Sequence, residues 1–183
     1  MGKGIVDKLK DEFSIKEEWI SLEIHPETPP QGRNLSQVYS EDTRRELYKR
    51  LNESGKDYGI KFSKRDISSN SRLALLLSEY AKATGSFDTL HKTLFQAYFE
   101  DGRDIGDREI LMQLAEKSGL SQKDCEQAWH DSDLEKRLLE NTAAAQQENA
   151  TAVPTFIIND KYQIIGAQPY KVFQDIIKKI EKE

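Results

Sequence analysis

The sequence predicts an α/β protein in which a small sheet domain, built from both ends of the chain, is interrupted by a long helical segment. Three observations carry this prediction. A helical pattern followed by an alternating segment opens the chain, helical periods fill the middle, and a hairpin pattern followed by an amphipathic helix closes it. We expect residues 1–39 and 150–183 to form the sheet domain and residues 40–149 to form an all-helical insertion.

The N-terminal part begins with an amphipathic helix over residues 3 to about 14, where apolar side chains recur at helical spacing opposite Lys and Asp. Residues 18–24 then alternate polar and apolar side chains, which predicts a strand. His25-Pro26 and the proline-containing loop that follows end this strand.

Six helices are predicted between residues 40 and 149, because the apolar period stays helical throughout this stretch. Polar residues that can cap a helix stand before most of the apolar stripes, and glycines end several of them. The aromatic stripe from Phe87 to Phe99 is expected to belong to the core. The predicted helix starts are Ser40, Ser69 or Asn70, Phe87, Asp107, Ser121 with Asp124, and Leu134.

The stretch from Ala150 to Pro169 is the part around which we expect the chain to be organised. Phe156-Ile157-Ile158 is a short apolar run, Asn159-Asp160-Lys161 supplies turn chemistry, and Tyr162–Ile165 forms a second run. Pro154 directly precedes the first strand, where a residue without an N–H group is tolerated. The pattern predicts a β-hairpin, and an amphipathic helix with Lys residues near its end follows it.

Composition excludes several classes of protein. The chain has 183 residues, 37% of them hydrophobic, which suits one compact domain with an insertion. A net charge of -5 with interleaved signs argues against nucleic acid and membrane surfaces as partners. No apolar run approaches the roughly 18 residues of a membrane span, and the start lacks a signal-peptide pattern. We therefore expect a cytoplasmic protein whose partners are proteins, peptides or small molecules.

Cysteine and histidine offer little chemistry of their own. Cys125 is the single cysteine, so it forms no intramolecular disulfide, and we expect a small, half-buried helix residue. His91 and His130 are expected at the surface or boundary of their helices. No spacing typical of metal ligands occurs, so neither a metal nor a resident cofactor is expected.

The hairpin region VPTFIINDKYQIIGAQPYKVF is similar to the end of the DsbA-like thiol oxidoreductases of the FrnE subfamily. Three other stretches agree, so the resemblance spans nearly the whole chain. It implies a thioredoxin-like (DsbA-like) fold with a large all-helical insertion, in which a cis Val153–Pro154 bond forms one wall of the active site. The three stretches are LEIHPETPPQGRNL, SSNSRLALLLSEYA and FQAYFEDGRDIGDREILMQLAEKSGL.

The resemblance also suggests substrate-binding residues. Val153 and Pro154 would hold an extended peptide through backbone groups. His25 would lie toward the active-site edge, and Asn70 would face the cleft. Each has an ordinary structural interpretation as well: a strand-start proline, a loop histidine and a helix cap.

The resemblance implies a catalytic Cys-x-x-Cys that this chain lacks. The subfamily places it where the first strand runs into the first helix, whose N-terminus lowers the thiol pKa. Gly2-Lys3 resembles the residues just after this motif, so we expect the first strand and both cysteines upstream of Met1. Three explanations for the missing motif stay open. The coding sequence has been assigned a start that is too late, the chain is a fragment of a longer protein, or it is a homologue that has lost its redox centre. A segment swapped from a second chain, giving a dimer, would be one way to fill the gap.

Three functions remain open from the sequence. The first is a protein thiol-disulfide oxidoreductase or isomerase, with reduction or isomerisation favoured in a cytoplasmic setting. The second is a glutathione-dependent isomerase or transferase of the 2-hydroxychromene-2-carboxylate isomerase type, with a Ser in place of the first cysteine. The third is a redox-inactive module that binds peptides in the cleft between the insertion and the sheet.

Overall fold

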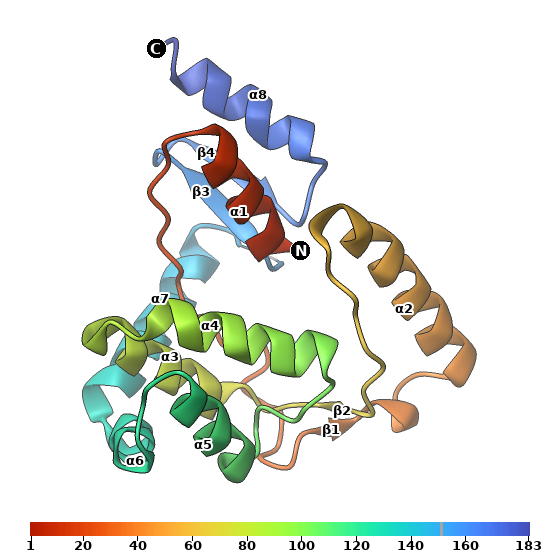
Figure 1. The fold of residues 1–183 in the computed structure, drawn as a ribbon, viewed down its shortest axis with the longest axis vertical. Coiled ribbons are helices and arrows are strands. Elements are labelled where there is room, and N and C mark those ends of the chain that lie inside the picture. The colour runs from red at the N-terminus through yellow and green to blue at the C-terminus, as the bar shows by residue number, and fades with distance from the viewer. Residues whose placement is uncertain (151) are drawn as a thin grey trace.

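The computed structural model describes residues 1–150 and 152–183. Figure 1 shows an upper part made from the two ends of the chain and a lower, helical part made from its middle. In the upper part, α1 (Gly2–Glu12) lies beside a hairpin of β3 (Thr155–Ile158) and β4 (Tyr162–Ile165). The last helix, α8 (Tyr170–Ile180), packs against α1.

The predicted hairpin is confirmed. Strands β3 and β4 are antiparallel, with Thr155 opposite Ile165 and Ile158 opposite Tyr162. Asn159 and Asp160 take positive φ values of 54° and 53°, and the Lys161 N–H donates to the Ile158 carbonyl to close the turn. Asn and Asp tolerate this left-handed conformation better than other residues with side chains, so the turn chemistry read from the sequence sets the strand register.

One apolar cluster holds the upper part together. Alternation along the strands turns Phe156, Ile158 and Ile164 toward the helices, while Ile157 is exposed on the opposite face. Phe173 of α8 is fully buried at the centre. The buried members of this cluster are Ile5, Leu9, Ile164, Phe173 and Ile177.

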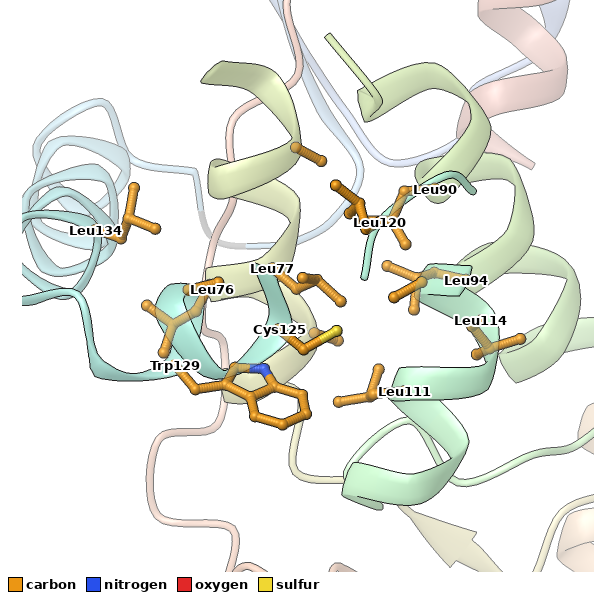
Figure 2. Packing of buried hydrophobic residues seen from close by; sticks show 14 of the residues in the cluster. Leu76, Leu77, Leu90, Leu94, Leu111, Leu114, Leu120, Cys125, Trp129 and Leu134 are labelled. Carbon is orange, nitrogen blue, oxygen red and sulfur yellow. The ribbon is translucent and has the colours of Figure 1, made fainter. Parts of the chain in front are cut away.

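The lower part is a bundle of five helices around a second, larger core, seen in Figure 2. Asp107 and Ser121 cap their helices as predicted, and Ser121 forms a full capping box with Asp124. Helix α4 continues directly into a five-residue π-helix, η3 (Gln96–Glu100). The helices are α3 (Arg72–Thr84), α4 (Phe87–Phe95), α5 (Arg108–Lys117), α6 (Gln122–His130) and α7 (Ser132–Gln147).

Helix α2 (Glu41–Gly55) stands at the right of Figure 1, beside the extended chain that leads to α3. Ser40 caps it as predicted. Its Asn52 side chain donates to the Phe62 carbonyl and accepts from the Phe62 N–H, at 3.0 and 2.9 Å. Short elements complete this region: β1 (Arg33–Asn34), η1 (Leu35–Gln37), η2 (Lys56–Tyr58) and β2 (Ile67–Ser68), with β1 antiparallel to β2.

The strand predicted over residues 18–24 is wrong. This segment is extended, but within the described residues it joins no sheet, and β3 pairs with β4 alone. Its inward side is also the polar one: Ser21 and Glu23 are buried, whereas Ile20 and Ile24 are 57% and 50% exposed. A strand is stabilised by a neighbouring ladder, and here the buried side meets a charged helix residue instead of an apolar sheet.

Two smaller expectations also change. The C-terminal end contributes the two-stranded hairpin, whereas β1 of the N-terminal end pairs with β2 of the middle segment and not with the hairpin. The N-cap of α3 is Ser71, and neither Ser69 nor Asn70 occupies that position. No helix in the described part of the chain is both long and apolar enough to cross a bilayer.

Candidate functional site

The candidate site lies where the N-terminus of α1 meets the residues before β3. The Val153–Pro154 peptide bond is cis. A Cβ atom added to Gly2 would lie 3.0 Å from the Pro154 Cβ and 3.7 Å from the Phe156 Cζ. The start of α1 therefore packs directly against Pro154. A residue larger than glycine at position 2 would not fit unless the proline moved.

The electrostatics of this helix start favour an anion. The first N–H groups of a helix lack intrahelical partners and lie at the positive end of its dipole. No side chain in the described chain caps them in α1. Burial lowers the pKa of the Met1 α-amino group, and the nearby Glu100 carboxylate opposes that shift.

Tyrosines line one flank of α1. A Cβ atom on Gly4 would lie only 2.7 Å from the Tyr58 Cβ, so this ring covers the helix backbone. The Tyr170 hydroxyl donates to the Lys8 carbonyl at 3.1 Å. Burial, followed by hydrogen bonding to Glu12, raises the pKa of Tyr170 to about 12. An open hollow of about 290 Å³ runs along this flank between the tyrosines.

His25 and Asn70, the other predicted site residues, lie together in a separate place. The Asn70 amide donates to the Thr28 carbonyl at 2.6 Å and accepts from the Arg72 N–H at 2.9 Å. The Thr28 N–H donates to the His25 carbonyl, and the exposed His25 ring lies 3.2 Å from the Glu27 carboxylate. Among the described residues, no hydrogen bond or ion pair joins this group to Val153 or Pro154.

His91 is the residue that the sequence pattern misplaced. We expected a surface or boundary position, but the side chain is buried between aromatic rings. Its ring centroid lies 4.4 Å from that of Trp19, 5.0 Å from Phe87 and 4.3 Å from Phe95. Phe87 and Phe95 are one helical turn away on either side, so this spacing could have indicated an enclosed ring, whereas the Trp19 contact is tertiary.

Burial lowers the pKa of His91 to about 4, and the Lys3 ammonium adds to the effect. The imidazole is therefore neutral at neutral pH, on α4 and against the ring of Trp19. Several charged groups act on this ring from α1, from the extended segment and from α4 itself. They are Lys3, Asp7, Glu17 and Asp88.

The stability of the protein should fall as the pH falls from 6.5 to 4, in part because of His91. In this window the unfolded chain, with an ordinary histidine pKa near 6.5, binds a proton that the folded chain excludes. His91 should contribute a loss of at most about 3 kcal/mol. Replacing His91→Phe keeps an aromatic ring and should remove this part of the pH dependence, measured by urea unfolding at pH 7 and pH 4.

The exposed His130 provides the matched control. Its Nδ1 lies 2.8 Å from the Glu126 carbonyl in the same helical part of the chain. The variant His130→Gln should keep the wild-type pH dependence. If His91→Phe and the wild-type protein lose the same stability between the two pH values, the buried neutral imidazole makes no such contribution.

Cys125 has no place in the candidate site. Figure 2 shows its sulfur in the helical core near Leu77 and Leu111, and the residue is fully buried rather than half-buried as expected. Burial raises the pKa of the thiol, with Asp124 and Glu126 adding to the shift. Reactive thiols have lowered pKa values and access to solvent, so Cys125 is a packing residue.

Comparisons with known proteins find matches that span nearly the whole chain. The family model described as DSBA-like thioredoxin domain matches residues 2–178. YwbO of Bacillus subtilis, a protein of uncharacterized activity, is 27% identical over 100% of this chain and 91% of its own length.

Two solved structures share the fold. SCO1869, a probable DsbA oxidoreductase from Streptomyces coelicolor, superimposes with a TM-score of 0.89 at 22% identity. The match covers 100% of this chain and 84% of that one. A proposed protein disulfide isomerase from Nitrosomonas europaea has a TM-score of 0.63 at 12% identity, over 97% of this chain and 88% of that one. At these identities the likeness establishes the DsbA-like thioredoxin fold with its helical insertion.

Proposed function

Because the chain belongs to the DSBA-like thioredoxin domain family, we propose that it acts in a FrnE-like protein thiol-disulfide oxidoreductase or isomerase. The observation that carries the proposal is the packing of the α1 N-terminus against Pro154. A cysteine at such a helix end is activated, because the dipole and the free N–H groups stabilise a thiolate. A substrate disulfide lying along Val153 and Pro154 would be next to that sulfur.

The proposal requires a dithiol that the 183 residues do not contain, since Cys125 is the single cysteine and is buried. We propose that a strand ending in Cys-x-x-Cys lies directly upstream of Met1. Two features support this position. The edge of β3 away from β4 has no partner among the described residues, and the extended segment 18–24 is unpaired as well. A strand between them would complete both ladders.

The exchange would proceed in two balanced steps. The first cysteine thiolate attacks one sulfur of the substrate disulfide, an S–S bond to the enzyme forms, and the substrate S–S bond breaks. The leaving thiolate takes a proton from solvent. The second cysteine then attacks the mixed disulfide and releases the second substrate thiol, so the substrate is reduced and the enzyme dithiol is oxidised. If a substrate thiolate attacks the mixed disulfide instead of the second cysteine, a new substrate S–S bond forms and the bond to the enzyme breaks, so the substrate is isomerised and the enzyme dithiol is regenerated.

The substrate contacts proposed for Val153 and Pro154 are consistent with their surroundings. Val153 is 50% exposed, and Ile157 on the outer face of β3 is 53% exposed. We propose that an extended peptide pairs with the backbone of Val153, at the end of this edge that precedes β3 and that the proposed strand leaves free. His25 and Asn70 remain predictions as substrate residues, and a cytoplasmic location and the absence of a resident cofactor remain expectations.

A second candidate is a redox-inactive module that binds peptides at the same edge. The observation that favours it is the burial of Cys125, which leaves these 183 residues without an accessible thiol. This candidate predicts saturable binding of an extended peptide without turnover. The glutathione-dependent isomerase would instead require a Ser at the position proposed for the first cysteine.

The test begins with the native coding DNA in frame before Met1. The encoded extension would be joined to this chain, and insulin-disulfide reduction would be assayed beside the unextended chain and a Ser-x-x-Ser variant. We expect a Cys-x-x-Cys and activity in the extended protein alone. An extension with a Ser first would move the assignment to glutathione chemistry, and a stop codon there would refute the redox proposal and leave peptide binding.

A further inference from the structure

Arg65 is a partly buried cation that has no counter-ion among the residues that the structure describes. Its Nε atom is enclosed and has no hydrogen-bond partner. Within the described residues its guanidinium forms no ion pair, whereas its neighbours in sequence, Lys64 and Asp66, each have a partner. Asp66 binds Arg44 at 2.8 Å, and Glu41 lies 3.9 Å from Lys64. The two Nη groups are not enclosed in this way, so they are the part of the guanidinium that an acceptor from outside the chain can reach.

Aromatic rings fix the plane of this guanidinium. Its central carbon lies 4.0 Å from the centroid of the Tyr98 ring and 5.6 Å from that of Phe99. Stacking on an aromatic face leaves the edge of the guanidinium, which carries its N–H groups, directed away from the ring. Both aromatic residues belong to the π-helix η3, a form that is rare and frequently marks functional sites.

The backbone around Arg65 is held on two sides. The Arg65 N–H donates to the Tyr48 hydroxyl of α2 at 3.1 Å. Two residues earlier, the Ser63 N–H donates to the Phe99 carbonyl of η3 at 2.9 Å. The side chain is therefore presented from an anchored segment, which lowers the ordering cost of binding a ligand.

We propose that Arg65 and the ring of Tyr98 form a binding site for a carboxylate ligand. A planar guanidinium with a free edge matches the two oxygens of a carboxylate in a bidentate pair. The carboxylate comes from a small organic acid or from an acidic residue of a peptide, and both present the same group. This site is independent of the dithiol chemistry proposed above, because none of its residues takes part in that exchange.

The experiment is a titration of the whole protein followed by NMR of the arginine Nε–H signals. The signal of Arg65 is identified by its loss in Arg65→Lys. Succinate and an N-acetylated, C-terminally amidated glutamate tripeptide are added in turn, each compared with sodium chloride at equal ionic strength and with the matched glutamine tripeptide, which is also amidated and carries no carboxylate. We expect a saturable shift of the Arg65 signal with succinate, with the glutamate peptide, or with both, and no shift with the glutamine peptide.

The variants make the test specific. Arg65→Lys keeps the positive charge but loses the two parallel N–H groups of the guanidinium that a carboxylate can bind together. This variant should therefore bind the carboxylate about tenfold more weakly. Arg45→Lys, at a residue with an exposed side chain paired to Asp42, should bind as the wild type does. Because Arg65→Lys lacks the Arg65 signal, its binding is measured by calorimetry. If this variant does not fold, the Arg65 signal is assigned in the wild type through correlations along the side chain, and the wild-type titration decides alone. Shifts that match those with chloride, or saturation by inorganic phosphate and by neither carboxylate, would overturn the proposal and leave Arg65 as a stacking residue.

Discussion

Replacing Arg72→Met is expected to lower the free energy of unfolding by about 3–5 kcal/mol. The Arg72 Nη1 lies 2.6 Å from a carboxylate oxygen of Glu23, whose side chain is only 5% exposed. Its Nη2 binds Glu135 of α7, so one guanidinium joins the extended segment, α3 and α7. Removing it leaves the Glu23 carboxylate buried without a counter-charge, and that is the large cost.

Urea unfolding followed by circular dichroism at 222 nm measures this effect. Glu135→Gln is the matched control, because that side chain is 53% exposed and an exposed pair contributes at most about 1 kcal/mol. The double variant Glu23→Leu with Arg72→Met removes both charges and should recover most of the loss. A single Arg72→Met variant within about 1 kcal/mol of the wild type would show that water already solvates Glu23.

The same ion pair explains how the extended segment is oriented. Because Glu23 turns inward to meet Arg72, the neighbouring Ile20 and Ile24 turn outward, where about half of each side chain is exposed. Apolar side chains on an unpaired strand are the ones that a sheet neighbour would cover. Under the proposed function, these isoleucines lie beside the strand that carries the dithiol.

Replacing Phe173→Ala is expected to cost about 3–5 kcal/mol of stability. Phe173 is fully buried, and its ring meets that of Phe156 edge to face at a centroid distance of 4.8 Å. It fills the space between α8, α1 and the hairpin, with Ile5 and Ile164 in the same cluster. The loss combines the transfer of the ring to water with the cavity left behind.

Denaturant unfolding of three proteins checks this prediction. The control is Val172→Ala, which truncates the residue before Phe173 in the same helix. The Val172 side chain is 39% exposed, so this change should lower the free energy of unfolding by less than about 1 kcal/mol. A Phe173→Ala variant as stable as Val172→Ala would show that the upper cluster contributes little to the measured transition. In that case the larger helical core would dominate unfolding.

Local chemistry was sufficient to predict much of this fold from the sequence. The hairpin of residues 155–165 follows from alternation and from an Asn-Asp turn. Most helices follow from apolar spacing, and Ser40, Asp107 and Ser121 were recognised as caps because an N-cap acts within one turn of its own helix. Features that depend on neighbours close in sequence were therefore predicted.

Contacts between segments distant in sequence decided the rest. Residues 18–24 alternate as a strand does, but a strand needs a ladder partner, and a buried Glu23 needs a cation 49 residues away. His91 is buried because Trp19 covers it, and Gly2 reaches Pro154 from the opposite end of the chain. The sequence by itself determined most of the elements and the family resemblance. The candidate site and the stacking of Arg65 on Tyr98 exist only through tertiary packing, because their energies belong to pairs of residues that no local pattern encodes.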